Sequence, residues 1–236
     1  MLWNVDGKQL EWVCAAYLSQ DQVAIQEILN EFDQHTDNQQ RLGLPSRLTA
    51  KTFVFRLLYG GTAYSYGHDP DFAGLGTEAY WERIIQKFYE KYSGIKSWHT
   101  LLEETAKRSG RIVSPTGRVY HYEPLIRGDR VTWPRTKILN YIVQGLAADL
   151  MAIGRVTLWK RLKGVEGIKL INTVHDSIVL DVDEKTCHNI SIATVIKDSF
   201  RDVPKNFEKL FGVEFNLPVR VEIEKGMDWA NMEKVA

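Results

Sequence analysis

The sequence has little cysteine, no excess charge of either sign and no apolar run of membrane-spanning length. Its two cysteines, Cys14 and Cys187, lie far apart and fit no metal-ligand spacing, so we expect reduced thiols in a cytoplasmic protein. Thirty basic residues balance thirty acidic ones, so the composition lacks the basic surplus of many nucleic-acid-binding proteins. A local basic groove beside an acidic site stays compatible with it. We recognise no signal peptide, low-complexity linker or internal repeat in the sequence.

The 236 residues suffice for one large domain or two small ones, with 44% hydrophobic residues to fill a core. Apolar periodicity and turn signals predict strands near both ends of the chain and helices in the middle. The predicted strands are 2–5, a hairpin of 168–174 with 178–182, and 218–224; the predicted helices include 9–18, 22–32, 47–59, 77–92, 95–109, 135–162 and 184–201. Segments 33–46 and 60–76 read as connections. The pattern indicates an α+β fold with a helical subdomain inserted into a sheet subdomain.

Four residues of the segment 47–59 recur at every fourth position: Arg47, Lys51, Phe55 and Tyr59. Residues with this spacing share one face of a helix, so the face carries two cations followed by two aromatic rings. Such a face suits a triphosphate at one end and a stacked base at the other. An ordinary amphipathic helix, whose Arg and Lys extend over apolar surface toward water, explains the stripe equally well when it is taken alone.

Two acidic residues stand where predicted strands end. Asp6 follows the first strand, and Asp176 lies in the turn of the hairpin between 174 and 178. Two-metal phosphoryl transfer needs at least two carboxylates that converge on a pair of divalent ions. A lone Asp at a strand end is more often a turn or cap residue, and spacing does not show that these two side chains meet.

Several motifs, in order, resemble DNA polymerase family A (the Pol I-like enzymes). The segment from Asp6 to Glu11, Asp-Gly-Lys-Gln-Leu-Glu, resembles the first palm motif, usually Asp-Tyr-Ser-Gln-Ile-Glu. The segment Val-His-Asp-Ser ending at Ser177 resembles the third, usually Val-His-Asp-Glu. The stripe at 47–59 resembles the fingers helix, and Asn140 with Gln144 resembles the Asn-x-x-x-Gln-Gly of the family's long helix.

The resemblance implies a right-hand polymerase with a helical fingers subdomain, 19–130, inserted into an antiparallel-sheet palm formed by 1–18 and 131–236. It implies two Mg²⁺ ions, with Mn²⁺ as a substitute, held by Asp6, Asp176 and the Gly7 backbone carbonyl. The implied dNTP-binding residues are Arg47, Lys51, Phe55, Tyr59, His35, Glu11 and Gln9, with Lys51 also counted as catalytic and Glu11 crowding the sugar 2′ position. The implied residues toward primer and template are Asn140, Gln144, His175, Arg118 and Arg135.

The sequence departs from the family pattern at three places. Gly7-Lys8 replaces Tyr-Ser, Ser177 replaces the Glu after the second Asp, and the usual Arg before Asn140 falls on Thr136, with Arg135 one residue away. The family also has a thumb, and usually a 3′–5′ exonuclease, ahead of the first motif. We therefore expect a bacteriophage-like polymerase portion, acting in the host cytoplasm if viral, with a second polypeptide supplying thumb and exonuclease, and with primer–template DNA and dNTPs as partners.

Two other functions stay open from the sequence. The departures suit a non-catalytic polymerase-like module that binds DNA or organises a replication complex, although such a scaffold has no need of both aspartates with Arg47 and Lys51. A two-metal nuclease also uses paired carboxylates, but the fingers stripe has no purpose there. We expect no membrane partner.

Overall fold

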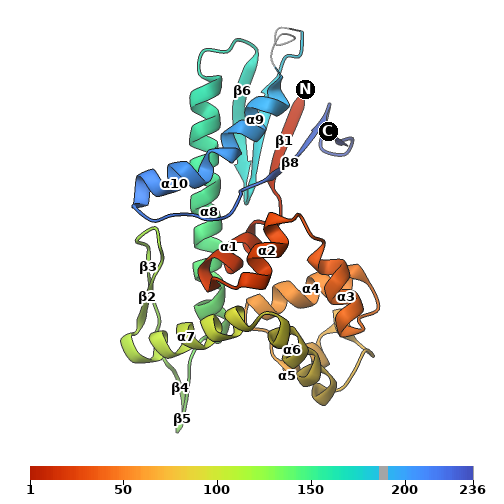
Figure 1. The fold of residues 1–236 in the computed structure, drawn as a ribbon, viewed down its shortest axis with the longest axis vertical. Coiled ribbons are helices and arrows are strands. Elements are labelled where there is room, and N and C mark those ends of the chain that lie inside the picture. Colours follow the sequence, from red (N-terminus) through yellow and green to blue (C-terminus); the bar gives the residue numbers. More distant parts are fainter. Residues whose placement is uncertain (186–190, 236) are drawn as a thin grey trace. The chain divides into compact units, whose positions relative to one another are not determined.

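The structure is a computed structural model that describes residues 1–185 and 191–235 (Figure 1). It divides into two compact units. The sheet unit is Met1–Glu11 with Gly145–Ala236, and the helical unit is Trp12–Gln144. From the sequence we predicted subdomain boundaries after residues 18 and 130, whereas the compact units change after Glu11 and Gln144. Cys187 lies outside the described residues.

An antiparallel sheet of five strands forms the framework of the sheet unit, in the order β6-β7-β1-β8-β9. The strands are β1 (Leu2–Gly7), β6 (Ile168–Val174), β7 (Ser177–Val182), β8 (Val221–Gly226) and β9 (Glu233–Lys234). All residues of β7 except Asp181 are buried, and the buried side chains at every second position of β1, β7 and β8 include Trp3, Val5, Ile178, Leu180 and Ile223. Since side chains alternate across a strand, these residues mark one covered face and leave Asp6 on the other. The predicted strands and hairpin are confirmed.

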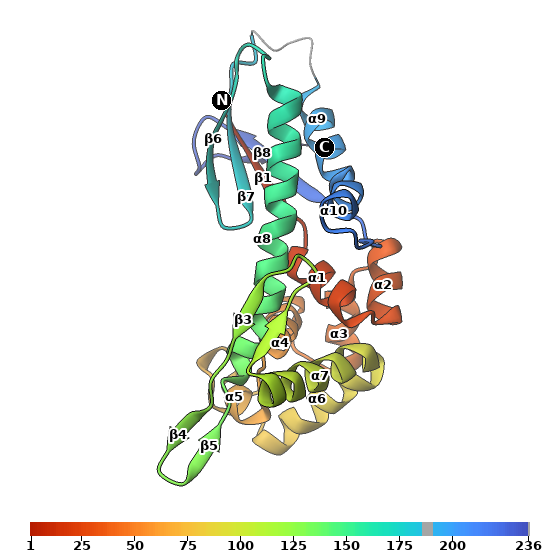
Figure 2. The ribbon, with the colours of Figure 1, turned by 90° about the vertical axis from the view of Figure 1, so that its left-hand side faces the viewer.

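Helices α8 (Arg135–Leu162) and α9 (Ile192–Arg201) lie on one side of this sheet, and α10 (Val203–Phe211) follows α9 (Figure 2). A Cβ added to Gly154 of α8 would come within 2.4 Å of the Phe200 ring of α9. The glycine therefore allows the two helices to pack closely. The bounds of α8 agree with the prediction, whereas the helix predicted from residue 184 begins at Ile192 and residues 186–190 are outside the description.

Helix α8 is long and apolar enough to cross a membrane, with a mean hydropathy of 1.2 over its most apolar stretch. Half of that stretch is buried inside the protein. A core helix of a globular protein has the same properties, so these two measures do not make α8 a membrane segment.

Seven α-helices, the first ten residues of α8 and four short strands are described in the helical unit. The helices are α1 (Leu10–Ser19), which starts in the sheet unit, α2 (Gln22–Leu29), α3 (Gln34–Leu42), α4 (Arg47–Leu58), α5 (Ala63–His68), α6 (Glu78–Lys91) and α7 (Ser93–Ser109), with a 3₁₀ turn at Pro70–Phe72. The strands form two hairpins, β2 (Arg111–Val113) with β3 (Val119–His121) and β4 (Leu125–Arg127) with β5 (Arg130–Thr132).

Aromatic rings fill the core of the helical unit. Phe53 of α4 is fully buried, and its ring centroid lies 5.0 Å from Tyr66, 5.9 Å from Trp81 and 6.0 Å from Phe88. Rings at such distances gain edge and offset-stacking contacts beyond the burial of their area. This cluster fixes which face of α4 points inward, so the Arg47–Lys51–Phe55 stripe lies on a less buried face.

The prediction that 33–46 is only a connection was wrong, because α3 occupies most of it. The Asp33 side chain accepts from the backbone N–H groups of His35 and Thr36, and Gly43 ends the helix in a left-handed conformation (φ 69°). Both ends therefore carry standard cap chemistry. The segment reads as a connection because most of its residues are polar and too few apolar ones mark a helical period. The predicted loop 60–76 likewise contains α5, which begins with a capping box at Thr62 and Ser65.

Candidate active site

The two aspartates singled out in the sequence meet at one end of the sheet. In the register of β1 with β7, Asp6 pairs with Ser177, the residue after Asp176. The Gly7 backbone N–H continues this pairing and donates to the Asp176 carbonyl oxygen at 3.1 Å. His175 and Asp176 form the two-residue turn of the β6–β7 hairpin, with His175 in a left-handed conformation (φ 53°). Sequence reasoning named both residues, and the register supplies the link between them.

Two further acids lie on the same face of the sheet and were not singled out from the sequence. Glu222 of β8 pairs directly with Asp6, and Glu224 pairs with Asn4, two residues before Asp6. Burial raises the pKa of Asp6 to about 6, and the negative charges of Asp176, Glu222, Glu224 and Glu11 raise it in the same direction. The alternation of Val221, Glu222, Ile223 and Glu224 was the available signal, since it places acids opposite the buried Ile223.

Ser177 stands where the family motif has a second acid, and its hydroxyl serves the hairpin. The Ser177 side chain donates to the Val174 carbonyl oxygen at 2.9 Å and is buried. It closes the turn that carries Asp176. Ser177 brings no negative charge to this position of β7. On the other side of Asp6, Glu222 occupies the matching position on β8 and does carry one.

The residues after Asp6 turn the chain from β1 into α1. Gly7 is buried, and a Cβ there would lie 3.1 Å from the Leu10 side chain and 3.4 Å from the Met151 sulfur. Gln9 adopts a positive φ of 54°, and Glu11 lies in the first turn of α1. The electrostatic effect of Glu11 on Asp6 places it near the acid cluster. The sugar-facing role of Glu11 and Gln9, and the Gly7 carbonyl as a metal ligand, remain predictions.

The donor set fits divalent cations of the magnesium type. Among residues 1–185 and 191–235, no three His, Cys, Asp or Glu side chains form a ready-made metal cage. Mg²⁺ in phosphoryl-transfer sites takes one or two carboxylates and completes its shell with water and substrate phosphates. Asp6, whose pKa is raised by burial and by four other carboxylates, is an oxygen donor in an excess of negative charge. A cation would relieve that charge.

In the helical unit, α4 places the predicted stripe as expected. Arg47 and Lys51 are exposed, and Phe55 is half-buried with the Lys51 Nζ 6.0 Å from its ring centroid. Tyr59 follows directly as the C-terminal cap residue of α4. Arg47 also forms a two-point ion pair with Asp33, from Nε to Oδ2 at 2.9 Å and from Nη2 to Oδ1 at 3.1 Å. The sequence reasoning did not foresee this pair.

His35 of α3 is buried in the helical unit. Only 1% of it is exposed, and its ring centroid lies 5.8 Å from that of Phe55. Burial lowers the pKa of His35 to about 4, with Arg47 and Lys51 acting in the same direction. The ring is therefore neutral near pH 7 and supports Phe55 from behind in this conformation. Its contact with a triphosphate stays a prediction.

Of the five residues predicted to contact DNA, three are exposed, one is half-buried and one is held by hydrogen bonds within the protein. Gln144, Arg118 and His175 are exposed, and Asn140 is half-buried one turn before Gln144 on α8. Arg135 is engaged inside the helical unit: Nε donates to Glu103 at 2.7 Å and Nη1 donates to the Gly60 carbonyl oxygen at 2.7 Å. The Arg135 side chain therefore holds the C-terminal end of α4, and its role toward DNA remains a prediction.

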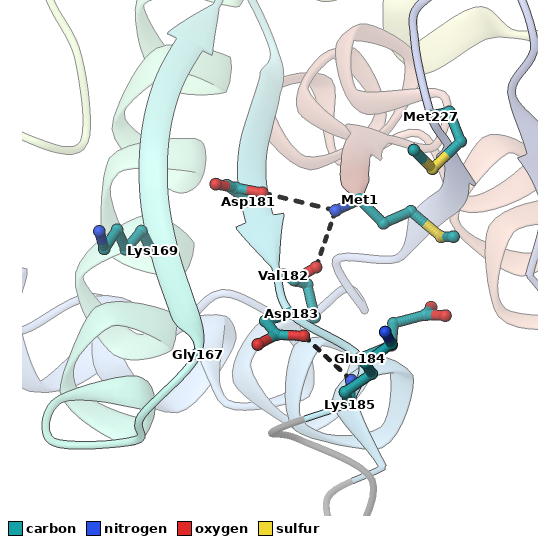
Figure 3. Close-up of a pocket in the computed structure, with 9 residues that line it drawn as sticks. All are labelled: Met1, Gly167, Lys169, Asp181, Val182, Asp183, Glu184, Lys185 and Met227. Atoms are coloured by element: carbon teal, nitrogen blue, oxygen red, sulfur yellow. Dashed lines mark hydrogen bonds and ion pairs between the residues drawn. The ribbon is translucent and has the colours of Figure 1, made fainter.

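A cavity of about 550 Å³ lies at the other end of the same strands (Figure 3). Its lining includes Met1, where β1 is about to begin, and Asp181 and Val182, where β7 ends. The Met1 amino nitrogen donates to the Val182 carbonyl oxygen at 2.8 Å. Met1 and Asp6 are five positions apart, roughly 17 Å at the usual rise of a strand, so this cavity is separate from the acidic site.

Comparison with known proteins decides the family. The family model described as DNA polymerase family A matches residues 1–231. The chain belongs to this family. It is 26% identical over 245 residues to the thermostable DNA polymerase I of Thermus aquaticus and 29% identical over 240 residues to that of Thermus filiformis. These alignments cover 99% and 97% of the chain but 27% of each relative, so the chain spans about a quarter of their length.

The fold agrees with this family assignment. A solved structure, the POL domain of Pol1 from M. smegmatis in complex with DNA primer-template and dNTP, superposes with a TM-score of 0.78 at 19% identity. The match covers 97% of this family A chain and 40% of that one. The mixed helical and antiparallel-sheet architecture is thus the fold of a family A polymerase domain, and the predicted α+β class is confirmed.

Proposed function

We propose that this chain is the palm–fingers part of a DNA-directed DNA polymerase, which adds dNTPs to a primer 3′ end. The observation that carries the proposal is the backbone hydrogen bond from Gly7 to Asp176, which places two aspartates of distant sequence position beside one another in an acidic cluster. Membership of family A and the likeness to a polymerase domain that binds primer-template and dNTP support it.

Asp6 and Asp176 would hold the catalytic magnesium ions, together with the Gly7 carbonyl oxygen. When bound, the two ions would activate the primer 3′ hydroxyl and neutralise the charge that develops during phosphoryl transfer. Glu222 and Glu224 keep the local potential negative on the same face of the sheet and so strengthen cation binding. Ser177 keeps the turn closed and with it the position of Asp176.

Arg47 and Lys51 would bind the β- and γ-phosphates of the incoming nucleotide. Both cations are exposed one turn apart on α4, which is the arrangement that positioning and charge stabilisation of a triphosphate need. Phe55, one turn further, offers its ring to the base and sugar, and Tyr59 follows at the helix end. Asn140 and Gln144 on α8 would contact primer and template by hydrogen bonds.

The surrounding parts of a polymerase are also part of the proposal. A thumb and a 3′–5′ exonuclease would come from a second polypeptide, in a bacteriophage-like replication system that acts in the cytoplasm. β6 supports the need for a partner, because it is an edge strand of the sheet with Ile171 and Val174 exposed. Uncovered apolar edges are a liability that proteins usually relieve by pairing or covering.

A non-catalytic polymerase-like module is favoured by one observation, the commitment of Ser177 to the hairpin turn in place of a second acid. Primer extension decides between the two functions. The purified chain, alone and with any polypeptide that co-purifies with it, is given a primer–template, dNTPs and Mg²⁺, beside an Asp176→Asn variant and an EDTA control. Incorporation that disappears in both controls is the expected result. Primer–template binding without incorporation by any preparation would establish the non-catalytic module.

A further inference from the structure

Asp33 and Arg47 join the start of α3 to the start of α4 within the helical unit. Asp33 is the N-cap of α3, and Arg47 is the first residue of α4. A cation in the first turn of a helix faces the positive end of the helix dipole, which is unfavourable without a nearby anion. Asp33 supplies that anion in a two-point geometry, which is stronger and more directional than a single contact.

The Asp33 carboxylate is itself firmly held. Oδ1 accepts from the N–H groups of His35 and Thr36 at 3.2 and 3.3 Å, and Oδ2 accepts from the Thr36 hydroxyl at 2.7 Å. Counting the two bonds from Arg47, five donors converge on one carboxylate. The hydrogen bonds from Arg47 and Thr36 lower the pKa of Asp33, so it is ionised throughout the neutral range.

The pairing leaves part of the Arg47 guanidinium available. Of its five N–H donors, the Nε–H and one Nη2–H point at Asp33, so the edge formed by Nη1 and the other Nη2–H keeps three donors. The Arg47 side chain is 50% exposed. A phosphate could therefore bind the outer edge while Asp33 retains the inner one.

We propose that Asp33 is a positioning residue, which fixes the Arg47 guanidinium so that its outer edge is presented to the triphosphate of the incoming nucleotide. The inference rests on the proposed function. Positioning by Asp33 reduces the entropic cost of phosphate binding, because an arginine that is already held in place loses less side-chain entropy when a phosphate binds. The opposite role, in which Asp33 competes with the nucleotide for Arg47, predicts an effect of opposite sign.

Asp33→Asn tests this role, because Asn is as good an N-cap as Asp but carries no charge. We expect the KM for dNTP to rise about tenfold, the size of a lost charged hydrogen bond, with kcat changed less than threefold. The matched control is Asp37→Asn, which removes an acid from the same helix whose partner is Lys91, away from α4. Its KM should stay at the wild-type value. An equal thermal midpoint of Asp33→Asn and wild type would show that the cap is intact.

A double-mutant cycle separates positioning from independent action. If Asp33 works through Arg47, the Asp33→Asn/Arg47→Ala double variant has the KM of Arg47→Ala alone. Additive effects would overturn the inference, and so would a lower KM in Asp33→Asn, which is the signature of competition.

Equilibrium binding of inorganic tripolyphosphate separates this inference from the proposed function. A chain that binds tripolyphosphate, loses affinity in Asp33→Asn and yet incorporates no nucleotide would retain the positioning role without the polymerase. A chain that extends primers with equal KM in Asp33→Asn and wild type would be a polymerase in which Asp33 has no such role. Failure of the wild type in both assays would overturn both.

Discussion

The two units assemble their chemical groups in different ways. In the sheet unit, Asp6 and Asp176 are far apart in the sequence and become neighbours only through the register of β1 with β7. In the helical unit, Arg47, Lys51 and Phe55 lie on one helix, and their common face follows from a spacing of four. A site on one helix is therefore visible in the sequence, whereas a site across strands needs the pairing of the sheet before its members can be recognised.

The largest loss of activity is expected from a substitution in the acidic site of the sheet unit. Asp6→Asn should lower template-dependent incorporation by ~10³-fold or more, since loss of a metal ligand removes several kcal/mol of transition-state stabilisation. Glu222→Gln is the matched control, because it removes one charge from the neighbouring position of β8. It should lose less than about tenfold, the range of a single weakened electrostatic interaction. Single-turnover primer extension measures both, and equal losses would contradict the assignment of Asp6 as the ligand.

Two phenylalanines of α4 separate folding from function in the helical unit. Phe53→Ala should lower the free energy of unfolding by about 3–5 kcal/mol, because it leaves a cavity among Tyr66, Trp81 and Phe88. Phe55→Ala, two residues away on the half-buried stripe, should cost clearly less stability but raise the KM for dNTP. Urea unfolding followed by tryptophan fluorescence, with steady-state kinetics, gives both quantities. A larger stability loss in Phe55→Ala would place the core on the wrong face of α4.

Removal of the second cation of the stripe should be less severe than loss of an aspartate. Lys51→Ala deletes an exposed ammonium group one turn after Arg47, and the expected loss in kcat/KM is about 10–100-fold, the value of one hydrogen bond to a charged phosphate. Lys87, an exposed lysine on α6, provides the control substitution Lys87→Ala. An unchanged kcat/KM in Lys51→Ala would remove the stripe from the nucleotide site.

In the helical unit, the free energy of unfolding should decrease as the pH falls. Burial lowers the pKa of His99 to about 3, below the ordinary 6.5, so the unfolded chain takes up a proton first as the pH falls. Stability from this group is complete above pH 6.5 and is lost toward pH 3, with about 2 kcal/mol lost by pH 5. His99→Gln should therefore show a smaller loss of unfolding free energy between pH 8 and pH 5. An equal loss would mean that His99 is protonated in the folded state.

In the sheet unit, the free energy of unfolding should instead decrease as the pH rises, and by a smaller amount. The folded pKa of Asp6, about 6, exceeds its ordinary value of 3.8, so the folded state binds the proton more tightly. Stability is therefore lost as the pH rises from about 4 to 6. In metal-free buffer at pH 8, Asp6→Asn should raise the thermal midpoint by about 2–4 °C, the effect of ~1 kcal/mol after solvent screening. The two proteins should converge below pH 4, and a variant less stable at pH 8 would contradict the charge repulsion.

Periodicity and turn signals were sufficient for most of the fold. The long helix α8, the stripe helix α4 and the β6–β7 hairpin were predicted because each shows a clear period or a turn between two apolar runs. Helix α3 was missed because its sequence is polar and its existence depends on caps at Asp33 and Gly43. The β4–β5 hairpin has short strands with exposed apolar residues, so no alternation marked it.

Only those residues of the candidate site that a local sequence pattern marks could be predicted. Asp6 and Asp176 could be named because each follows an apolar strand, but only the sheet register shows that Glu222 lies beside Asp6. The Asp33–Arg47 pair joins two helices through side chains fourteen positions apart, and no period links them. Contacts that depend on how elements pack are the ones that a single sequence does not reveal.

The hydrogen bond from Gly7 to Asp176 has a consequence for how this site tolerates change. The two aspartates are located by counting residues along β1 and β7 from that bond, so inserting or deleting one residue in β1 would turn Asp6 to the covered face and bring a neutral side chain to its place. Exchange of residues around the pair leaves the count intact. The length of β1 is thus more tightly constrained than its composition. Substitutions in β1 are compatible with the site, whereas insertions and deletions are not.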